Sequence, residues 1–397
     1  MRVLVLNGGS SSLKSVLYEM GNDAPSRPPA PLWDARVDWG HHPGTAEIRI
    51  RTLAGTTNRT LPIPSQEAVL RPVLESLPGK VDAAGHRVVH GGRAFRDSTR
   101  ITPEVKREIA RLAEYAPEHN RLELEAIEAV EAILGPDLPQ IAVFDTAFHA
   151  TLAPAAYTYP VPRSWVDDGL RRYGFHGISH QYTSRRAAEI LGRPLESLRM
   201  ITCHLGNGCS LAAVDGGRSI DTTMGFTPVA GLMMGTRSGS IDPGIIIHQV
   251  RHCGYRAEDL DRILNKESGL KGLSRVSGDM REVLKAMDAG NADAQLAFDV
   301  YVHRLNQEIG SMLASLGGLD ALVFTAGVGE NTPLVRSRVA ERFAFLGARL
   351  NESANAQSPA DAEISTPDAA VRLLIVHTEE DWEIARECHR LNAAGAL

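Results

Sequence analysis

The sequence predicts an α/β protein built from two related domains. Short apolar segments rich in β-branched residues alternate with helical patterns along most of the chain, which is typical of α/β folds. The 397 residues are enough for two or three domains of ordinary size. A strand–turn–strand pattern around Asn7 returns around Asn207, 200 residues later. Similarity over such a long period favours two related domains that each open with a glycine-rich hairpin, and the alternative is a chance similarity of two turn-rich hairpins.

The first half of the chain begins with strands and continues into helices. Val3–Leu6 and Leu13–Tyr18 are apolar strands on either side of a turn, and Trp33–Leu61 shows the weak alternation of further strands. The remaining elements expected in this half are a helix at Ser65–Leu77, a strand at Ala83–His90, a helix at Pro103–Tyr115 with Thr102 as its N-cap, a helix at Arg121–Leu134 and a buried strand at Ile141–Phe144. The proline-rich stretch Pro154–Pro162 is the expected domain junction.

The second half starts the pattern again. Met200–Leu205 and Leu211–Val214 are strands joined by a glycine-containing turn, and Ala321–Thr325 and Val371–Val376 are two more. A turn is expected at Gly327–Asn331. Helical patterns cover Asp259–Asn265, Met280–Ala289, Ala292–Leu316, a segment that starts at Pro333, and Asp381–Leu391.

Composition and charge exclude several classes of protein. The net charge is −6 and the pI is about 6.2, so a sequence-wide basic surface for nucleic acid is not expected, although a local basic cleft for an anion remains open. The apolar run Met1–Leu6 is too short for a signal peptide, and no stretch approaches the length of a membrane span. The four cysteines lack CxxC spacing, which indicates free thiols in a reducing cytoplasm. We therefore expect a cytoplasmic protein that binds neither nucleic acid nor membrane.

Three turns rich in glycine and asparagine follow apolar strands: Asn7–Ser12, His204–Ser210 and Gly327–Asn331. Small residues leave backbone N–H groups open to phosphate oxygens, and several such turns around one cleft suit a nucleoside triphosphate. The first turn is not a P-loop, because Leu13 occupies a glycine position and a strand follows instead of a helix. The third turn lacks the last glycine of G-x-G-x-x-G, since Thr332 stands there, so a dinucleotide-binding fold is only an alternative.

Four charged or titratable residues stand where side chains often carry chemistry. Arg87 interrupts an apolar strand, where an unpaired charge is costly. Arg237 lies in a glycine- and serine-rich loop, from which a guanidinium can hold a carboxylate or phosphate with two hydrogen bonds. Asp145 ends a buried strand, and His176 lies between two glycines and next to Phe175. Each has a structural alternative: a salt bridge for the arginines, a turn cap for Asp145 and a buried ring for His176.

Long strings of the sequence resemble the acetate kinase (acetokinase) family, within the actin-like, sugar-kinase-like phosphotransferase superfamily. The strings are those of residues 7–14, 85–92, 143–149, 173–177, 201–208, 234–243 and 324–331, in the family's order over nearly the whole chain. The resemblance implies two ribonuclease-H-like (actin-like ATPase) domains with an interdomain nucleotide cleft. Residues 1–149 and 380–397 would form the N-terminal domain, and residues 150–379 the C-terminal domain for nucleotide binding and dimerisation.

The resemblance also implies an activity: reversible, ATP-dependent phosphorylation of acetate to acetyl phosphate, with Mg²⁺ (or Mn²⁺), in a homodimer. By family likeness Arg87 binds the substrate carboxylate, while Asp145 (as the acid), His176 and Arg237 are catalytic. Asn7 and Glu380 help to hold the metal, and His119 is a further phosphate-side donor. The implied ATP-binding residues are Lys14, His204, Leu205, Gly206, Asn207, Gly208, Asp279, Met280, Arg281, Gly327, Val328, Gly329, Glu330 and Asn331.

The chain departs from the family pattern in its expected acid pocket. Glu118 stands where the family usually has leucine. A carboxylate there repels an acid substrate unless it points away or pairs with a cation such as Arg121. A kinase for propionate or another short-chain acid is therefore an open alternative.

Other departures lie on the nucleotide and metal sides. Met280 and Glu282 replace the usual aromatic residue and aspartate, and Glu379 replaces an asparagine. A remote alternative is a non-catalytic nucleotide-binding module of the same superfamily. Such a module would not require all four of Arg87, Asp145, His176 and Arg237. The chain contains all four, which favours an enzyme.

Overall fold

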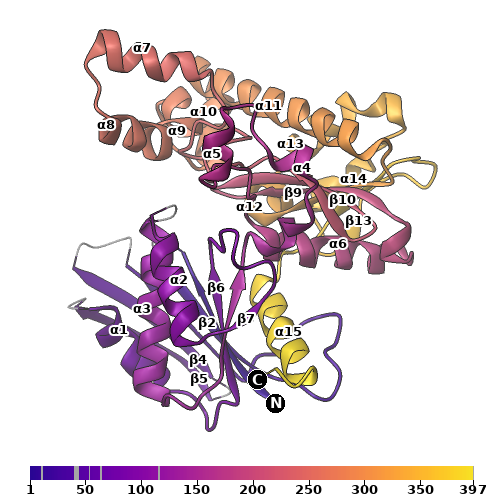
Figure 1. Ribbon diagram of the computed structural model, residues 1–397. Helices are drawn as coiled ribbons and strands as arrows, with labels where there is room; N and C mark the ends of the chain where they lie inside the picture. Colours follow the sequence, from indigo (N-terminus) through magenta and orange to yellow (C-terminus); the bar gives the residue numbers. More distant parts are fainter. Residues whose placement is uncertain (10–11, 40–43, 53, 63–64, 115–116, 397) are drawn as a thin grey trace. The chain divides into compact units, whose positions relative to one another are not determined.

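The computed structural model describes residues 1–9, 12–39, 44–52, 54–62, 65–114 and 117–396, except for the side chains of residues 66 and 117–119. The chain divides into two compact units, each a mixed α/β structure around its own sheet, which confirms the predicted fold class (Figure 1). Unit 1 comprises Met1–Phe148, Gly177–Ser179 and Glu379–Leu397. Unit 2 comprises His149–His176 and His180–Thr378.

Unit 1 contains an eight-stranded sheet in the order β5-β4-β3-β2-β1-β6-β8-β7. Its strands are β1 (Arg2–Gly8), β2 (Ser12–Glu19), β3 (Trp33–Asp38), β4 (Thr45–Thr52), β5 (Gly55–Pro62), β6 (Ala83–Val88), β7 (Thr99–Arg100) and β8 (Gln140–Phe144). β1, β6 and β8 are parallel neighbours, and the other pairs are antiparallel. The carboxyl ends of the three parallel strands therefore meet at one edge of the sheet.

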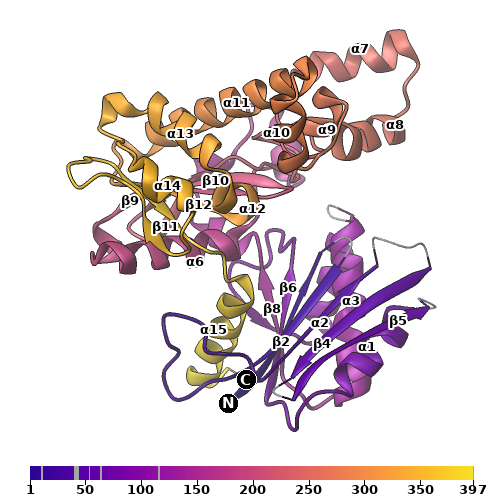
Figure 2. The ribbon, with the colours of Figure 1, turned by 180° about the vertical axis from the view of Figure 1, so that it is seen from behind.

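Helices cover both faces of this sheet (Figures 1 and 2). On one face α1 (Gln66–Leu74) and α3 (Pro117–Leu134) share an apolar core with Leu4 and Leu6 of β1. On the other face α15 (Glu380–Ala393) packs on β1 and β6, where a Cβ at Gly85 would lie only 2.6 Å from the Cys388 sulfur. Glycine at position 85 is what permits this close approach of helix to strand.

The ends of several elements in unit 1 have clear local causes. The predicted cap of α2 (Pro103–Leu112) is confirmed, since the Thr102 hydroxyl accepts a bond from the Val105 N–H at 3.3 Å. β6 stops at Val88 instead of reaching His90, because the N–H groups of Val89 and His90 donate to the side chains of Glu123 and Asn120. α3 begins at Pro117, four residues before its predicted start.

Unit 2 contains a six-stranded sheet in the order β11-β10-β9-β12-β14-β13. Its strands are β9 (Arg199–Leu205), β10 (Cys209–Asp215), β11 (Arg218–Thr222), β12 (Ala321–Thr325), β13 (Ala362–Glu363) and β14 (Arg372–Ile375). β9, β12 and β14 are parallel neighbours, and β9 forms an antiparallel hairpin with β10. The first five strands of this order repeat the order β3-β2-β1-β6-β8 of unit 1, so the repeat around Asn7 and Asn207 is a structural one.

Two helices lie against opposite faces of the second sheet. Tyr301 of α11 (Ala292–Leu316) contacts the Cys209 sulfur of β10, with its hydroxyl at 3.6 Å, whereas His180 of α6 (Gly177–Leu191) bonds to Ser210. Because successive side chains of a strand point to opposite faces, Cys209 and Ser210 meet different helices. The other helices of unit 2 are α4 (Pro154–Tyr157), α5 (Arg163–Asp167), α7 (Pro243–Cys253), α8 (Ala257–Arg262), α9 (Gly269–Ser274), α10 (Met280–Asp288), α12 (Ala326–Asn331), α13 (Pro333–Arg342) and α14 (Glu352–Gln357).

The turn predicted at Gly327–Asn331 is wrong, because these residues belong to helix α12. The Glu330 carboxylate accepts the Ala326 N–H at 2.8 Å and so satisfies a donor at the start of its own helix. Helices α6 and α7 were not predicted. Among the described residues, no helix is long and apolar enough to cross a membrane.

Candidate active site

Arg87 and Asp145 form a buried ion pair at the carboxyl ends of two parallel strands of unit 1. Arg87 is the fifth residue of β6, and Asp145 directly follows β8. The Arg87 Nε and Nη2 atoms donate to Asp145 Oδ2 at 3.0 and 2.7 Å, and Nη1 donates to the Gly8 carbonyl at 3.0 Å. Asp145 is only 1% exposed, and its Oδ1 has no hydrogen-bond partner among the described residues. The guanidinium is thus held in place before any ligand arrives.

The charges around this pair keep the arginine protonated. Burial lowers the pKa of Arg87, but the carboxylates of Asp145 and Glu380 outweigh that effect and raise it. Burial raises the pKa of Asp145, and Glu380 adds to this increase while Arg87 opposes it. A fixed cation with a planar, forked arrangement of donors suits a carboxylate or a phosphate.

A second polar cluster of unit 1 joins the end of β1 to the start of α15. Asn7 Nδ2 donates to Asp381 Oδ1 at 2.8 Å and to Glu380 Oε2 at 3.3 Å. Lys14 lies opposite Asn7 in the β1–β2 hairpin and forms an ion pair with Asp381. Sequence reasoning named Asn7, Lys14 and Glu380 but missed Asp381, although it is next to Glu380 in the first turn of a helix.

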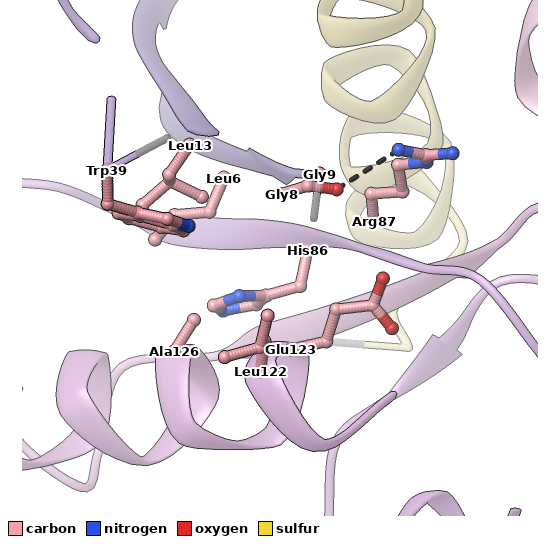
Figure 3. Close-up of a pocket in the computed structure, with 10 residues that line it drawn as sticks. All are labelled: Leu6, Gly8, Gly9, Leu13, Trp39, His86, Arg87, Leu122, Glu123 and Ala126. Carbon is pink, nitrogen blue, oxygen red and sulfur yellow. Dashed lines mark hydrogen bonds between the residues drawn. The ribbon is translucent and has the colours of Figure 1, made fainter. Parts of the chain in front are cut away.

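Glu123 borders a small cavity on the α3 face of the sheet (Figure 3). The cavity measures about 20 Å³, which is room for about one water molecule. Its lining consists of Leu6, Gly8, Gly9, Leu13, Trp39, His86, Arg87, Leu122, Glu123 and Ala126. Glu123 Oε2 accepts the Val89 N–H at 3.0 Å, while Oε1 has no partner among the described residues. Burial raises the pKa of Glu123 to about 8, so this carboxyl is mainly protonated at neutral pH.

Sequence reasoning also missed Glu123, although the sequence does contain a signal for it. On a helix, residues three, four and seven positions apart share a face. Ala126, Ile127 and Val130 are buried, and Glu123 lies on the same face, whereas the nearby Glu125 forms an exposed pair with Arg121. Helical spacing therefore distinguishes the buried glutamate from its exposed neighbours.

In unit 2, two histidines and an arginine gather at the turn between β9 and β10. The rings of His176 and His204 are stacked, with centroids 4.1 Å apart and planes at 23°. A Cβ placed on Gly208 would lie 3.2 Å from Arg237 Nη1 and 3.5 Å from His176 Nε2, so glycine lets both side chains reach the turn backbone. His176 has a φ of 57°, a left-handed conformation that is uncommon for a residue other than glycine and is often found at functional sites.

A pocket of about 690 Å³ lies beside this turn, a volume typical of small-molecule sites. It is lined by Gly206, Asn207, Gly278, Asp279, Met280, Arg281, Gly327, Val328, Asn331 and Thr332. Eight of these ten residues are among the predicted ATP-binding residues; Gly278 and Thr332 are not. The predicted residues thus converge on one pocket from the β9–β10 turn, the start of α10 and helix α12.

The other predicted ATP-binding residues lie elsewhere. Leu205 is fully buried, and Gly329 packs beside the Cys203 carbonyl. Glu330 Oε2 contacts His377 Nδ1 at 2.6 Å, and its Oε1 accepts the N–H groups of Ala326 and Thr378. His204 and Gly208 belong to the cluster around His176, and Lys14 belongs to unit 1. The predictions for Glu118 and His119 concern side chains outside the described set.

Both units thus present groups for anions, but of different kinds. Unit 1 offers a buried guanidinium held by a carboxylate, with two further carboxylates and an amide nearby. Unit 2 offers a glycine-rich pocket, two stacked imidazoles and Arg237. Positioning and charge neutralisation are what phosphoryl transfer needs most from a protein.

Comparisons with known proteins agree on one family. Residues 2–386 match the model of the acetokinase family. The chain is 57% identical to an acetate kinase of Gloeobacter violaceus, over 98% of either protein. Its fold matches the crystal structure of Porphyromonas gingivalis acetate kinase, with a TM-score of 0.89, 38% identity and coverage of 98% of this chain and 99% of that one. A propionate kinase from Francisella tularensis subsp. tularensis matches with a TM-score of 0.89, 35% identity and coverage of 97% and 98%.

Proposed function

The chain belongs to the acetokinase family, and we propose that it transfers the γ-phosphoryl group of ATP to acetate. A carboxylate oxygen of acetate forms a bond to phosphorus as the bond to the bridging oxygen of ADP breaks, and the electron pair leaves with ADP. The reaction is reversible and yields acetyl phosphate. The observation that carries the proposal is the fixed Arg87–Asp145 pair, within a chain that is 57% identical to an acetate kinase over nearly its full length.

We assign the acid-binding groups to unit 1. Arg87 binds the substrate carboxylate, because its guanidinium stays charged and is already oriented by Asp145 and Gly8. Asp145 holds Arg87 in place as the carboxylate of this ion pair. A preoriented cation lowers the entropy that the substrate loses on binding.

We assign the nucleotide and the transferring phosphoryl group to residues of unit 2. The ten-residue pocket accommodates ATP, and its glycines give phosphate oxygens access to backbone N–H groups. His176 and Arg237 stabilise the charge that spreads over the phosphoryl oxygens in the transition state. Lys14 of unit 1 adds a positive charge for the nucleotide phosphates.

The donor set of Asn7, Glu380 and Asp381 fits Mg²⁺. This ion commonly binds to one or two carboxylates together with water and substrate phosphates, and the cluster supplies two carboxylates and one amide oxygen. When bound, the ion neutralises phosphate charge. Asn7 would orient both carboxylates for this task, because its Nδ2 already donates to Glu380 and to Asp381.

One assay tests the activity and the choice of acid together. The purified protein is incubated with ATP, Mg²⁺ and either acetate, propionate or butyrate, and the acyl phosphate is trapped as its hydroxamate. We expect the highest kcat/KM with acetate. Activity that favours propionate would replace acetate as the substrate, and absence of acyl phosphate from every acid would refute the proposed function.

We also propose a homodimer formed through unit 2. Helix α7 exposes Ile245, Ile247 and Val250, each about half exposed, and a second copy packed on this helix would bury part of that apolar surface. Ile247→Asp should shift the sedimentation coefficient towards that of a monomer. Phe345→Asp, at an exposed residue outside α7, is the matched control and should leave the dimer intact.

The proposed compartment is the reducing cytoplasm. All four cysteines, Cys203, Cys209, Cys253 and Cys388, are free thiols. Disulfides are rare in reducing compartments, so this state supports the proposal.

A further inference from the structure

A continuous chain of hydrogen bonds runs through unit 2 to His176. The Thr202 hydroxyl contacts His180 Nδ1 at 2.7 Å, and His180 Nε2 contacts Ser210 Oγ at 2.8 Å. Ser210 Oγ in turn contacts His176 Nδ1 at 2.9 Å. Thr202, His180 and Ser210 are all fully buried, so bulk water does not compete for these bonds. The chain couples the catalytic ring to a buried hydroxyl three hydrogen bonds away.

Thr202, at the buried end of this hydrogen-bond chain, determines which group donates and which accepts in each of its bonds. Among the described residues, His180 Nδ1 is the one hydrogen-bond partner of the Thr202 hydroxyl. A buried hydroxyl proton without an acceptor is costly, so Thr202 donates to His180 Nδ1. Burial keeps the pKa of His180 well below its usual value, so this ring is neutral and carries a single N–H. That proton is then on Nε2 and is donated to Ser210.

The same reasoning continues to His176. Ser210 accepts a bond from His180, and its own proton is therefore directed to His176 Nδ1. An imidazole that accepts at Nδ1 carries its proton at Nε2. His176 Nε2 lies on the side of the ring that faces Gly208, near Arg237 Nη1.

We propose that Thr202, His180 and Ser210 are positioning residues that hold His176 in its neutral tautomer with the proton on Nε2. His176 then donates this Nε2–H to the transferring phosphoryl group. A cationic His176 would instead donate Nδ1–H to Ser210. Ser210 would then accept from both histidines and leave its own proton without an acceptor, or all three bonds would reverse and leave the Thr202 proton without one. His176 is therefore a neutral donor, and Arg237 supplies the positive charge. The identity of the group that receives the bond rests on the proposed function.

The tautomer of His176 can be measured directly by ¹⁵N NMR of protein labelled at histidine, with His176→Gln used to assign the signals. The wild type should show an acceptor-type Nδ1 and a protonated Nε2. Thr202→Val keeps the shape of the side chain but removes the proton that sets the direction, so the His176 signals should move towards a mixture of tautomers. Thr202→Ser restores the hydroxyl and should restore the wild-type signals.

The kcat for acyl phosphate formation should fall in the variants that change the tautomer of His176. Ser210→Ala breaks the chain next to His176 and should lower kcat by up to about 10²-fold, the loss typical of one transition-state donor. Thr202→Val should lower kcat severalfold, and KM for ATP should stay unchanged in both variants. A loss of folding alone would not produce this combination.

Ser219→Ala is the matched control. Ser219 is as buried as Ser210 and also bonds to a histidine, with its Oγ 2.8 Å from His149 Nδ1. Unlike Ser210, it is not part of the hydrogen-bond chain to His176. This variant should be less stable, with the tautomer of His176 unchanged. Wild-type His176 signals in both Ser210→Ala and Thr202→Val would overturn the proposal. If the wild type makes no acyl phosphate but shows the expected tautomers, the proposed function is refuted, whereas the proposed role of the hydrogen-bond chain in setting the His176 tautomer stands.

Discussion

The two units share a strand order but differ in the chemistry at the ends of their strands. β3-β2-β1-β6-β8 of unit 1 and β11-β10-β9-β12-β14 of unit 2 follow the same order, and each begins with an antiparallel hairpin. At equivalent places in these hairpins Asn7 pairs with Lys14, and His204 pairs with Ser210. The shared backbone thus sets where side chains gather, and the individual residues set what they do.

The difference between the hairpins has a physical consequence. Charged groups in unit 1 are neutralised by one another, as in the pairs Arg87–Asp145 and Lys14–Asp381. In unit 2 the bonds among His180, Ser210 and His176 join imidazole rings and a hydroxyl instead of a pair of opposite charges. Removing one group should therefore destabilise unit 1 more than unit 2, because a buried charge without its partner is costly.

The largest effect is expected for Arg87→Ala. The variant removes the proposed ligand of the substrate carboxylate and leaves Asp145 as a buried, unpaired carboxyl, a change that typically costs about 3–5 kcal/mol. The KM for acetate should rise and kcat/KM should fall by about 10²–10³-fold. Arg87→Lys should restore only part of the activity, since lysine lacks the planar fork. Arg121→Ala, at an exposed arginine of the same unit, is the control, and an unchanged KM in Arg87→Ala would refute the assignment.

Arg237→Ala should affect catalysis without the same loss of stability. Arg237 Nη1 donates to the Pro228 carbonyl at 3.3 Å, and a neutral carbonyl that loses a partner is less costly than the buried carboxyl that Arg87→Ala leaves behind. Loss of one transition-state donor should lower kcat by about 10²–10³-fold, while the midpoint of urea unfolding should change less than in Arg87→Ala. If Arg87→Ala and Arg237→Ala lower the midpoint of urea unfolding equally, unit 1 is not more sensitive than unit 2 to the loss of one group.

The sequence was sufficient for features that depend on local patterns. The two hairpins, the Thr102 cap and the strands that end near Arg87 and Asp145 all follow from short apolar runs, turn residues and capping rules. Family resemblance gave the activity and named eight of the ten residues that line the pocket of unit 2. The roles of these residues remain predictions.

Features that depend on tertiary contacts were not predictable in the same way. The start of α12 is satisfied by Glu330 of the same helix, but this use of the side chain is not evident from a glycine-rich string. The raised pKa of Glu123 depends on its burial against β6, and His180 joins the chain to His176 only because α6 packs on β9 and β10. The contacts of Glu123 and His180 join residues that are tens of positions apart, whereas the Glu330 contact is local.

The buried carboxyl of Glu123 should make the stability of the protein depend on pH. The pKa of Glu123 rises from 4.5 to about 8 on folding. Between these values the unfolded chain loses the proton while the folded protein keeps it, so the free energy of unfolding falls as pH rises. Glu123→Gln removes this effect and should gain stability relative to the wild type between pH 5 and pH 8, by an amount on the order of a few kcal/mol.

Urea unfolding at the two pH values measures this effect. Glu125→Gln changes an exposed glutamate of the same helix and should show no such gain. A difference between Glu123→Gln and the wild type that is the same at pH 5 and pH 8 would show that Glu123 is not buried as a protonated carboxyl.

A smaller loss of stability should occur in both units as the pH becomes acidic. Burial lowers the pKa of His86 in unit 1 and of His149 in unit 2 to about 4. As pH falls from 6.5 towards 4, the unfolded chain binds protons that the folded protein does not, so stability is lost over this range. His86→Gln and His149→Gln should each lose less stability than the wild type between pH 6.5 and pH 4.5. The exposed His303→Gln should behave as the wild type does, and a wild-type slope in both buried variants would contradict this account.

The smallest effect is expected for Arg281→Ala, at the wall of the unit 2 pocket that we propose for ATP. The Arg281 side chain is 86% exposed and pairs with Asp279, the N-cap of α10, at 2.5 Å. Exposed pairs contribute little to folding because water and salt screen them, so the midpoint of urea unfolding should not change. If the pocket binds ATP, loss of this cation should raise the KM for ATP by about 2- to 5-fold, the range typical of one exposed charge contact. The KM for acetate and kcat should stay as they are.

Arg121→Ala is the matched control in unit 1, because Arg121 is similarly exposed and pairs with Glu125 at 3.2 Å. It should alter neither KM. The rise in KM for Arg281→Ala should also shrink as salt is added, since screening weakens the contact of an exposed cation with a polyanion. A KM for ATP that stays at the wild-type value at both low and high salt would place the nucleotide away from the start of α10. The proposed division between an acid site in unit 1 and a nucleotide site in unit 2 would then require a different pocket for the nucleotide.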